Sequence, residues 1–308
     1  MKKGFILLLT SLLSWCMFAA AADVSESASG DYTYTLLEDG TAEIVGYSGS
    51  ETEISIPAAL DGYTVSSLGK DAFNRNRDLI SVIVPEGVTR IGEFAFYSCS
   101  YLERISLPEG ITEIGKMAFG ECTLLTELKL PASLSSLGDS AFYECRGLTE
   151  IIVPEGVTQI GRTAFYHCEA LTSLVLPGGV TTIGPCAFEG CKSLKTLDMP
   201  EKLTVIENNT FSQCKSLVYL ALPDGITEIG NTAFFGCDHV SYIVIPDSVT
   251  AIGEDAFSVV SPNGGWVANP GVVIVAGEGS FARQYCVEKG LQYASALPAD
   301  IADLPGEP

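Results

Sequence analysis

The sequence predicts an α/β-type solenoid, a stack of coils with a parallel β-sheet on one face and short helical turns on the other. Three residue types recur with a period of 23 and no insertion between copies, as expected when each coil stacks on the one before. Phenylalanine recurs nine times, which predicts nine coils. The three columns are Phe73, Phe96, Phe119, Phe142, Phe165, Phe188, Phe211, Phe234 and Phe257; Cys99, Cys122, Cys145, Cys168, Cys191, Cys214 and Cys237; and Pro85, Pro108, Pro131, Pro154, Pro177, Pro200, Pro223 and Pro246.

Each coil is predicted to begin with a short strand. In the coil Leu102–Cys122, polar and apolar residues alternate around Ile105 and Leu107, which favours a strand with these two side chains inward. Pro108 then ends the strand because it has no N–H to donate to a neighbouring strand.

A turn is predicted to return the chain to the start of the next coil. Gly115 supplies either a positive φ or room for a close backbone approach. Residues 116–122 are predicted to form a short helical turn, in which Ala118 allows close packing and Phe119 fills the core. Only stacking buries both faces of such a coil, so a single coil would not be stable alone.

The repeat resembles a known family. A period between 20 and 29 residues is typical of leucine-rich repeats, and residues 102–122 carry the pattern L-x-x-[IVL]-x-[ILV]-P-x-x-[IVL]-[TS]-x-[IL]-G-x-x-A-F-x-x-C. This pattern is similar to that of the BspA-like leucine-rich repeats (LRR_5) of bacterial and some protist surface proteins, over roughly residues 30 to 294. The resemblance implies an exported protein that adheres to host matrix, to other microbes or to secreted proteins.

Residues 30–56 are predicted to cap the N-terminal end of the stack. Tyr32–Leu37 and Thr41–Tyr47 alternate in polarity on either side of Asp39 and Gly40, which is the signal of a β-hairpin. The nine repeats then occupy residues 57–260.

Residues 261–294 are predicted to form a β-α-β cap at the other end. The elements expected are a loop over Ser261–Pro270 that carries Trp266, a strand over Val272–Val275, a helix over Ser280–Lys289 and a closing strand over Leu291–Ala294. The remaining residues, 295–308, are acidic and contain proline, and we expect them to be a disordered tail.

The seventh coil departs from the pattern. Glu207 replaces the glycine and Thr210 replaces the alanine, beside Asn208 and Asn209. We therefore expect a locally loosened turn.

The N-terminus is predicted to be an export signal. Lys2 and Lys3 precede an apolar run, which ends in the small residues Ala19–Ala22, so residues 1–22 have the order of a cleavable signal peptide. Because Gly4–Ala22 is 19 residues without a charge, an uncleaved membrane anchor is the alternative. After cleavage no membrane span is expected, and the protein is predicted to be secreted or loosely attached to the cell surface.

The charge argues against a nucleic-acid partner. The chain has 38 acidic and 17 basic residues, a net charge of -21, and removal of residues 1–22 takes away two lysines and no acid to give -23. No basic patch interrupts this excess. His167 and His239 lack the spacing of a metal site, and no nucleophile, phosphate-loop or dinucleotide motif is present. The sequence therefore predicts no metal, no cofactor and no enzymatic activity.

The cysteines are expected to be structural. Nine of the ten remain after the signal is removed, which is an odd number. Parallel stacking points the column side chains the same way, which argues for buried, reduced thiols, although the distance between coils does not exclude disulfides. Cys186 and Cys286 lie off the column and are the better candidates for reactivity.

The candidate partner site lies on the outward positions of the predicted sheet. Tyr219 and Tyr242 form its aromatic centre, flanked by the aliphatic residues Val175, Ala221 and Val244, while Arg104, Glu127 and Glu150 form a charged group nearer the N-terminus. An exposed apolar strip favours an interface, and tyrosine is a frequent anchor there. The first hypothesis is non-enzymatic recognition of a protein ligand on extracellular matrix, host or microbial surfaces. The alternative is a carbohydrate-binding module with Tyr219 and Tyr242 as stacking platforms.

Overall fold

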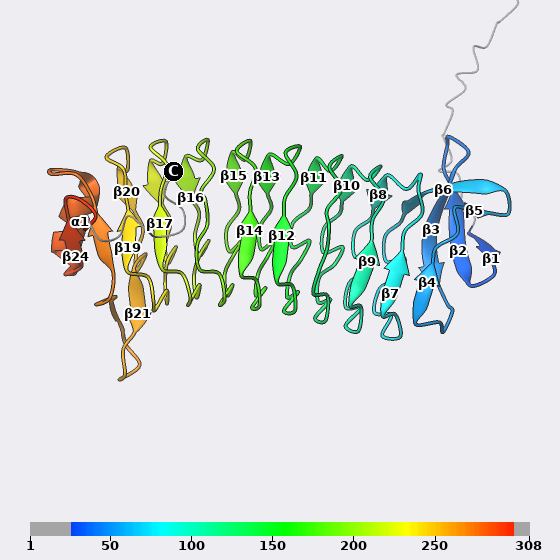
Figure 1. Cartoon of the computed structure of the whole chain (residues 1–308), viewed down its shortest axis with the longest axis horizontal. Helices are drawn as coiled ribbons and strands as arrows, with labels where there is room; N and C mark the ends of the chain where they lie inside the picture. The colour runs from blue at the N-terminus through cyan, green and yellow to red at the C-terminus, as the bar shows by residue number, and fades with distance from the viewer. Residues whose placement is uncertain (1–25, 299–308) are drawn as a thin grey trace, which may run out of the picture.

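The protein is an elongated solenoid. The computed structural model describes residues 26–298, so the predicted signal peptide and most of the predicted tail lie outside the described residues. The solenoid has about eleven turns with a 23-residue period. Figure 1 shows them side by side along one axis, from the N-terminal strands to α1 (Phe281–Lys289) and β24 (Gln292–Ala294). Nine turns carry the phenylalanine column, and the C-terminal strands add the rest.

The predicted strands form one face, here called the first strand stack. Neighbouring strands pair in parallel wherever they are hydrogen-bonded. Its members are β4 (Glu53–Ser55), β7 (Ser81–Ile83), β9 (Arg104–Ser106), β12 (Glu150–Ile152), β14 (Ser173–Val175), β17 (Tyr219–Ala221), β19 (Tyr242–Val244), β23 (Val273–Val275) and β24. Single bridges from Glu127 to Arg104 and Glu150 connect β9 with β12, whereas residues 196–198, between β14 and β17, form no strand.

A second row of strands, which the sequence analysis did not predict, forms another face. It passes through the isoleucine column of the repeat, as in Glu113–Ile114, where the inward isoleucine is fully buried. All eight strands of this row are two residues long, which is too short for an alternating pattern to be recognised. They are β8 (Arg90–Ile91), β10 (Glu113–Ile114), β11 (Ser136–Leu137), β13 (Gln159–Ile160), β15 (Thr182–Ile183), β16 (Val205–Ile206), β18 (Glu228–Ile229) and β20 (Ala251–Ile252).

The third side of each coil consists of turns. A short helical turn was predicted here, but the hydrogen bonds are not those of a helix. The N–H of Gly120 donates to Met117 O (3.1 Å) within the coil, whereas the N–H of Phe119 donates to Ala141 O (2.9 Å) of the next coil. Met117 and Glu121 have positive φ angles of 52° and 59°, which an α-helix does not contain. Every second N–H therefore points along the solenoid axis and connects coils, where a helix would keep it inside the coil.

The phenylalanine column forms a continuous ladder in the core. Rings of successive coils lie 4.9 to 5.7 Å apart between centroids, with interplanar angles of 1° to 19°. A tyrosine closes each end: Tyr47 lies 5.5 Å from Phe73, and Tyr285 lies 6.2 Å from Phe257 with its edge toward the ring. At the C-terminal end of the ladder, the Tyr285 hydroxyl donates a hydrogen bond to Gly253 O (3.2 Å), so this polar group has a partner although its ring is buried.

The cysteine column is buried and unpaired, as predicted. Each thiol lies beside the phenylalanine ladder and donates to a carbonyl of the preceding coil, as Cys122 Sγ does to Phe96 O (3.2 Å). Burial raises the pKa of the Cys145 and Cys191 thiols to about 12. The two off-column cysteines differ from the column and from each other. Cys286 is buried, and burial raises its pKa to about 11, whereas Cys186 is partly exposed, and burial followed by Glu189 raises its pKa. Their greater reactivity relative to the column stays a prediction.

These raised pKa values predict a protected set of thiols. At pH 8 the folded chain from residue 23 onward should react slowly with Ellman's reagent, because a protonated thiol is a poor nucleophile. In denaturant without reductant, all nine thiols should react at once. A count below nine in denaturant would show that disulfides form.

The turn of the seventh coil is regular, so the predicted local loosening is wrong for the turn itself. Phe211 N donates to Ala233 O (2.8 Å) as in other coils, and the Thr210 hydroxyl is buried and donates to Glu207 O (2.8 Å). The adjoining second row is interrupted between β15 and β16, beside Glu207 of the glycine column. It is interrupted in the same way between β11 and β13, where the glycine column keeps Gly138 and Gly161, so the interruption is not particular to the seventh coil.

The N-terminal hairpin is present as predicted. It consists of β2 (Tyr32–Leu36) and β3 (Ala42–Tyr47), which pair antiparallel. β1 (Ser27–Ser29) adds to β2, and β3 pairs in parallel with β6 (Tyr63–Leu68), whose own antiparallel partner is β5 (Ala59–Leu60). Since β6 pairs with β8, the hairpin extends the second row of strands.

The C-terminal cap contains the predicted β-α-β unit. β23 and β24 pair in parallel around α1, which begins after Ser280, whose side chain accepts a hydrogen bond from Arg283 N, and ends at Gly290 with a φ of 72°. Leucine, alanine and aromatic side chains of this unit cover the last coil of the core.

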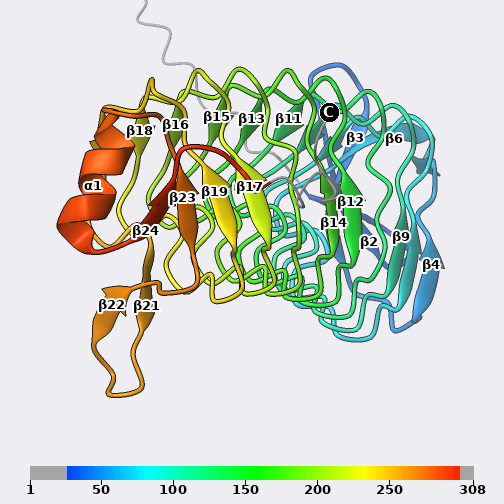
Figure 2. The same ribbon diagram turned by 60° about the vertical axis from the view of Figure 1, so that its left-hand side comes forward.

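The segment predicted as a loop is a second hairpin. β21 (Ser258–Val260) and β22 (Trp266–Ala268) pair antiparallel, and both views show them projecting beyond the outline of the stack (Figures 1 and 2). The turn is closed by Ser261 N donating to Gly265 O (2.7 Å). The sequence Pro-Asn-Gly-Gly between two valine-containing runs is a hairpin signal that identifies this element in retrospect.

Candidate partner-binding surface

The first strand stack places most of the predicted site residues in register. Tyr219 pairs with Tyr242 and Ala221 with Val244 on adjacent strands. Arg104, Glu127 and Glu150 likewise occupy successive positions of one column. The predicted columns are therefore rows of residues in register on one strand stack, whose strands Figure 2 shows side by side.

The predicted exposure of Tyr219 is wrong. Only 7% of its surface is accessible, and Tyr242 is half-buried, whereas both were expected to present their rings to a partner. A large ring on such a stack is covered in part by the side chains of adjacent coils, which lie about 4.8 Å away. A buried ring cannot act as a stacking platform, so the carbohydrate site predicted at these tyrosines lacks its central feature.

Val175 belongs to a different group from the one predicted. It pairs directly with Ile152, not with the tyrosine strands, because the coil of Asp198 separates it from Ala221. Ile152 and Val175 are 67% and 49% exposed and lie side by side on β12 and β14. We call this aliphatic pair the Ile152/Val175 patch. It brings two exposed aliphatic side chains together on adjacent strands, whereas Ile83 (52% exposed) lies apart from it on β7, and the sequence did not single the pair out as the centre of the face.

The charged group lies beside this patch. Arg104 approaches Glu53 (3.7 Å) and Glu103 (3.8 Å), so its charge is partly balanced. Glu127 and Glu150 are neighbours in the same column, and neither forms an ion pair with a basic side chain within residues 26–298. Like charges on adjacent strands destabilise a sheet. The face therefore has a local excess of negative charge beside an apolar pair.

The edge of the face contains a carboxylate that is held ionised. Glu109 follows the strand-ending proline of its coil and accepts a hydrogen bond from Ala132 N (2.9 Å) and one from Lys129 Nζ (3.3 Å). The backbone hydrogen bond, followed by the lysine, lowers the pKa of the Glu109 carboxyl. Lys129 on the sheet face is thus already paired and adds little free positive charge.

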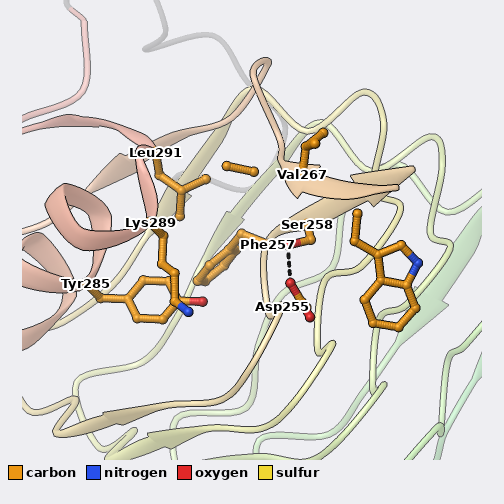
Figure 3. A pocket seen from close by; sticks show the side chains of 9 residues that line it. Asp255, Phe257, Ser258, Val267, Tyr285, Lys289 and Leu291 are labelled. Atoms are coloured by element: carbon orange, nitrogen blue, oxygen red, sulfur yellow. Dashed lines mark hydrogen bonds between the residues drawn. The ribbon is translucent and has the colours of Figure 1, made fainter. Parts of the chain in front are cut away.

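A small pocket lies at the C-terminal end, between the second hairpin and α1. Its volume is about 90 Å³, and Figure 3 shows aromatic, aliphatic and charged side chains around it. They are Asp255, Phe257, Ser258, Trp266, Val267, Ala268, Tyr285, Lys289 and Leu291. Trp266 lies here on a strand of the second hairpin, not in the predicted loop, and no role was predicted for it from the sequence.

A wider hollow lies at the first coil. Its volume is about 430 Å³, and it is lined by Gly46, Tyr47 and residues 71–78. Asn74 Oδ1 is buried there without a hydrogen-bond partner in the described chain, while its Nδ2 donates to Asp71 (2.6 Å). The hollow is polar and open, so an ordered water could reach this oxygen.

The described residues contain no cluster of three or more His, Cys, Asp or Glu side chains that could hold a metal ion. His167 Nδ1 lies 3.4 Å from Glu169, and the ring packs 4.4 Å from that of Tyr166, while His239 Nδ1 lies 2.7 Å from Lys215 O. No helix in residues 26–298 is long and apolar enough to cross a membrane.

The family model for the BspA type leucine-rich repeat region matches the chain with six copies, over residues 47–172 and 158–263. The chain belongs to the BspA-type leucine-rich repeat family. The sequence prediction of this family is thereby confirmed. Membership of the family supports a repeat-based binding role.

Solved structures of bacterial leucine-rich repeat proteins resemble this one. A leucine-rich repeat protein from Bacteroides ovatus is 31% identical, with a TM-score of 0.66, over 82% of this chain and 71% of that one. A leucine rich cell surface protein from Faecalibacterium prausnitzii is 25% identical, with a TM-score of 0.51, over 90% and 100%. A leucine-rich repeat protein of T. pallidum is 29% identical, with a TM-score of 0.51, over 70% and 91%. The comparison with curated proteins gave no match.

Proposed function

We propose that this protein is exported and binds a protein partner through the first strand stack, as an adhesion or recognition protein of the cell exterior. Residues 1–22 have the order of a signal peptide, and the similar protein of F. prausnitzii is described as a cell surface protein. Both support export.

The Ile152/Val175 patch carries the proposal for the partner. The two aliphatic side chains are 67% and 49% exposed and lie side by side on adjacent strands. A partner that covered them would remove apolar surface from water, which favours binding. Glu127 and Glu150 beside them attract basic side chains, because they have no basic partner in the described chain. A protein surface with an apolar centre and lysine or arginine at its rim fits this arrangement.

The experiment is a binding assay on immobilised fibronectin, fibrinogen and laminin with the chain from residue 23 onward. The double substitution Ile152→Ser/Val175→Ser should weaken binding by about tenfold or more, since each buried aliphatic side chain contributes about 1.5 to 3 kcal/mol. Because these residues are exposed, thermal unfolding should be unchanged. Binding should also weaken with added salt.

Ile83→Ser provides the matched control, because Ile83 is a similarly exposed (52%) isoleucine on the same face but far from the patch. It should change the affinity by less than about twofold. Equal losses in the two variants would refute the placement of the site, and binding to none of the three matrix proteins would count against adhesion to host matrix.

A further inference from the structure

The second hairpin is an uncharged projection on an acidic protein. No charged residue occurs from Phe257 to Gly277, although the whole chain has a net charge of -21. On this hairpin Val260, Trp266 and Val267 are 56%, 58% and 43% exposed. Hairpin turns on protein surfaces are usually polar, so an exposed indole at this position calls for a ligand that covers it.

The indole of Trp266 is held in place. Its ring centroid lies 4.8 Å from that of Phe235, which follows the core phenylalanine of an inner coil and is half-buried. Val260 pairs with Trp266 across the hairpin. The ring is thus supported from the solenoid while more than half of the side chain stays exposed, which is the arrangement of a rigid aromatic platform.

A polar pocket adjoins this platform. Trp266 and Val267 line it together with Asp255, Ser258 and Lys289, and Ser258 Oγ donates to Asp255 Oδ1 (2.9 Å), as Figure 3 shows. Its charged lining consists of one carboxylate and one ammonium group, so its net charge is zero. A volume of about 90 Å³ holds a small substituent but not a whole ring.

We propose that the second hairpin and this pocket form a binding site for a neutral saccharide. The C–H groups on one face of a sugar ring carry partial positive charge and pack against the negative face of the Trp266 indole. A hydroxymethyl or acetamido substituent enters the pocket, where the Asp255 carboxylate accepts hydrogen bonds and the Lys289 ammonium donates them. An anionic polysaccharide is disfavoured by the charge of the chain.

This site is separate from the one proposed for a protein partner. The Ile152/Val175 patch lies on β12 and β14, and the strands β17 and β19 come between it and the C-terminal cap (Figure 2). The two sites therefore bind independently, and a substitution in one leaves the other unchanged.

Tryptophan fluorescence gives a direct test. The chain has two tryptophans, Trp15 and Trp266, so the chain from residue 23 onward contains Trp266 alone. We expect a saturable change in its emission on titration with at least one of four neutral hexasaccharides, of the cello, malto, manno and N-acetylated chito series. Polygalacturonate should give none.

Variants and calorimetry complete the design. Trp266→Ala should weaken binding by about tenfold or more, as measured by calorimetry, because it removes the platform. Trp266→Tyr should retain binding within a few-fold, since it keeps an aromatic ring, and Ile152→Ser/Val175→Ser should bind saccharide normally. Unfolding curves of all variants establish that the fold is kept.

Three results would overturn the proposal. The first is no emission change with any of the four neutral series, and the second is saccharide binding that survives Trp266→Ala. The third is an emission shift that depends on protein concentration without sugar, together with a dimer in sedimentation velocity, or a shift on addition of phosphatidylcholine vesicles. In that case a second copy or a lipid surface covers the indole instead.

Discussion

Replacing Phe165 by alanine should destabilise the protein by about 3 to 5 kcal/mol, the range found when a fully buried aromatic side chain is truncated. Phe165 is fully buried in the middle of the ladder, with ring neighbours at 5.3 and 5.7 Å. Its loss leaves a cavity and separates the ladder into two shorter stacks. Adjacent coils cannot close the gap, because the hydrogen bonds of Phe165 N to Ala187 O (2.9 Å) and its equivalents fix the spacing of the turns.

Urea unfolding followed by circular dichroism measures this effect. The matched control is Phe281→Ala, since Phe281 is a phenylalanine in α1 with 40% of its surface exposed. It should cost less than about 1 kcal/mol. Similar losses for the two variants would mean that the ladder contributes no more than any other apolar contact.

Replacing Gly138 by alanine should destabilise the protein by about 2 to 3 kcal/mol, because an added Cβ has no space. That atom would lie 2.5 Å from Lys116 N and 2.6 Å from the carbonyl carbon of Gly115, both backbone atoms of the preceding coil. The coils must separate to accept it, which breaks the hydrogen bond from Gly138 N to Ile114 O (2.8 Å).

Gly178→Ala is the matched control for this prediction. A Cβ on Gly178 would meet no atom within 4 Å, so stability should change by less than about 0.5 kcal/mol. Urea midpoints of the two variants, measured under identical conditions, decide the matter. If Gly138→Ala were as stable as Gly178→Ala, the glycine column would not be required for close approach of the coils.

The strict repeat made the core predictable from the sequence. The phenylalanine and cysteine columns could be assigned to the interior because every copy occupies the same position in a 23-residue period. The strand around Ile105 and the β-α-β unit at the C-terminus follow from local alternation and from turn residues in the same way. The columns depend on contacts between equivalent positions of neighbouring coils, which a period describes, whereas the C-terminal unit, outside the repeat, follows from its local signals alone.

The surface was less predictable. Tyr219 was expected to be exposed because its position in the repeat faces outward, yet its burial depends on which side chains flank it on neighbouring strands. The turn at Met117 was expected to be helical, because local sequence does not reveal that its N–H groups bond to the next coil. Trp266 was placed in a loop because the repeat ends before it and offers no template.

The sequence by itself determined the solenoid, its family, its inward-facing columns and the acidic character of the chain. Periodicity encodes these features, since each coil repeats the contacts of the last. Only the tertiary structure decided which outward residues are accessible to a partner. Ile152, Val175 and Trp266 are exposed, whereas Tyr219 is buried. The exposure of a side chain depends on residues that are distant in the sequence but adjacent in the fold. For Trp266, which lies outside the repeat, the 23-residue period does not indicate which residues these are.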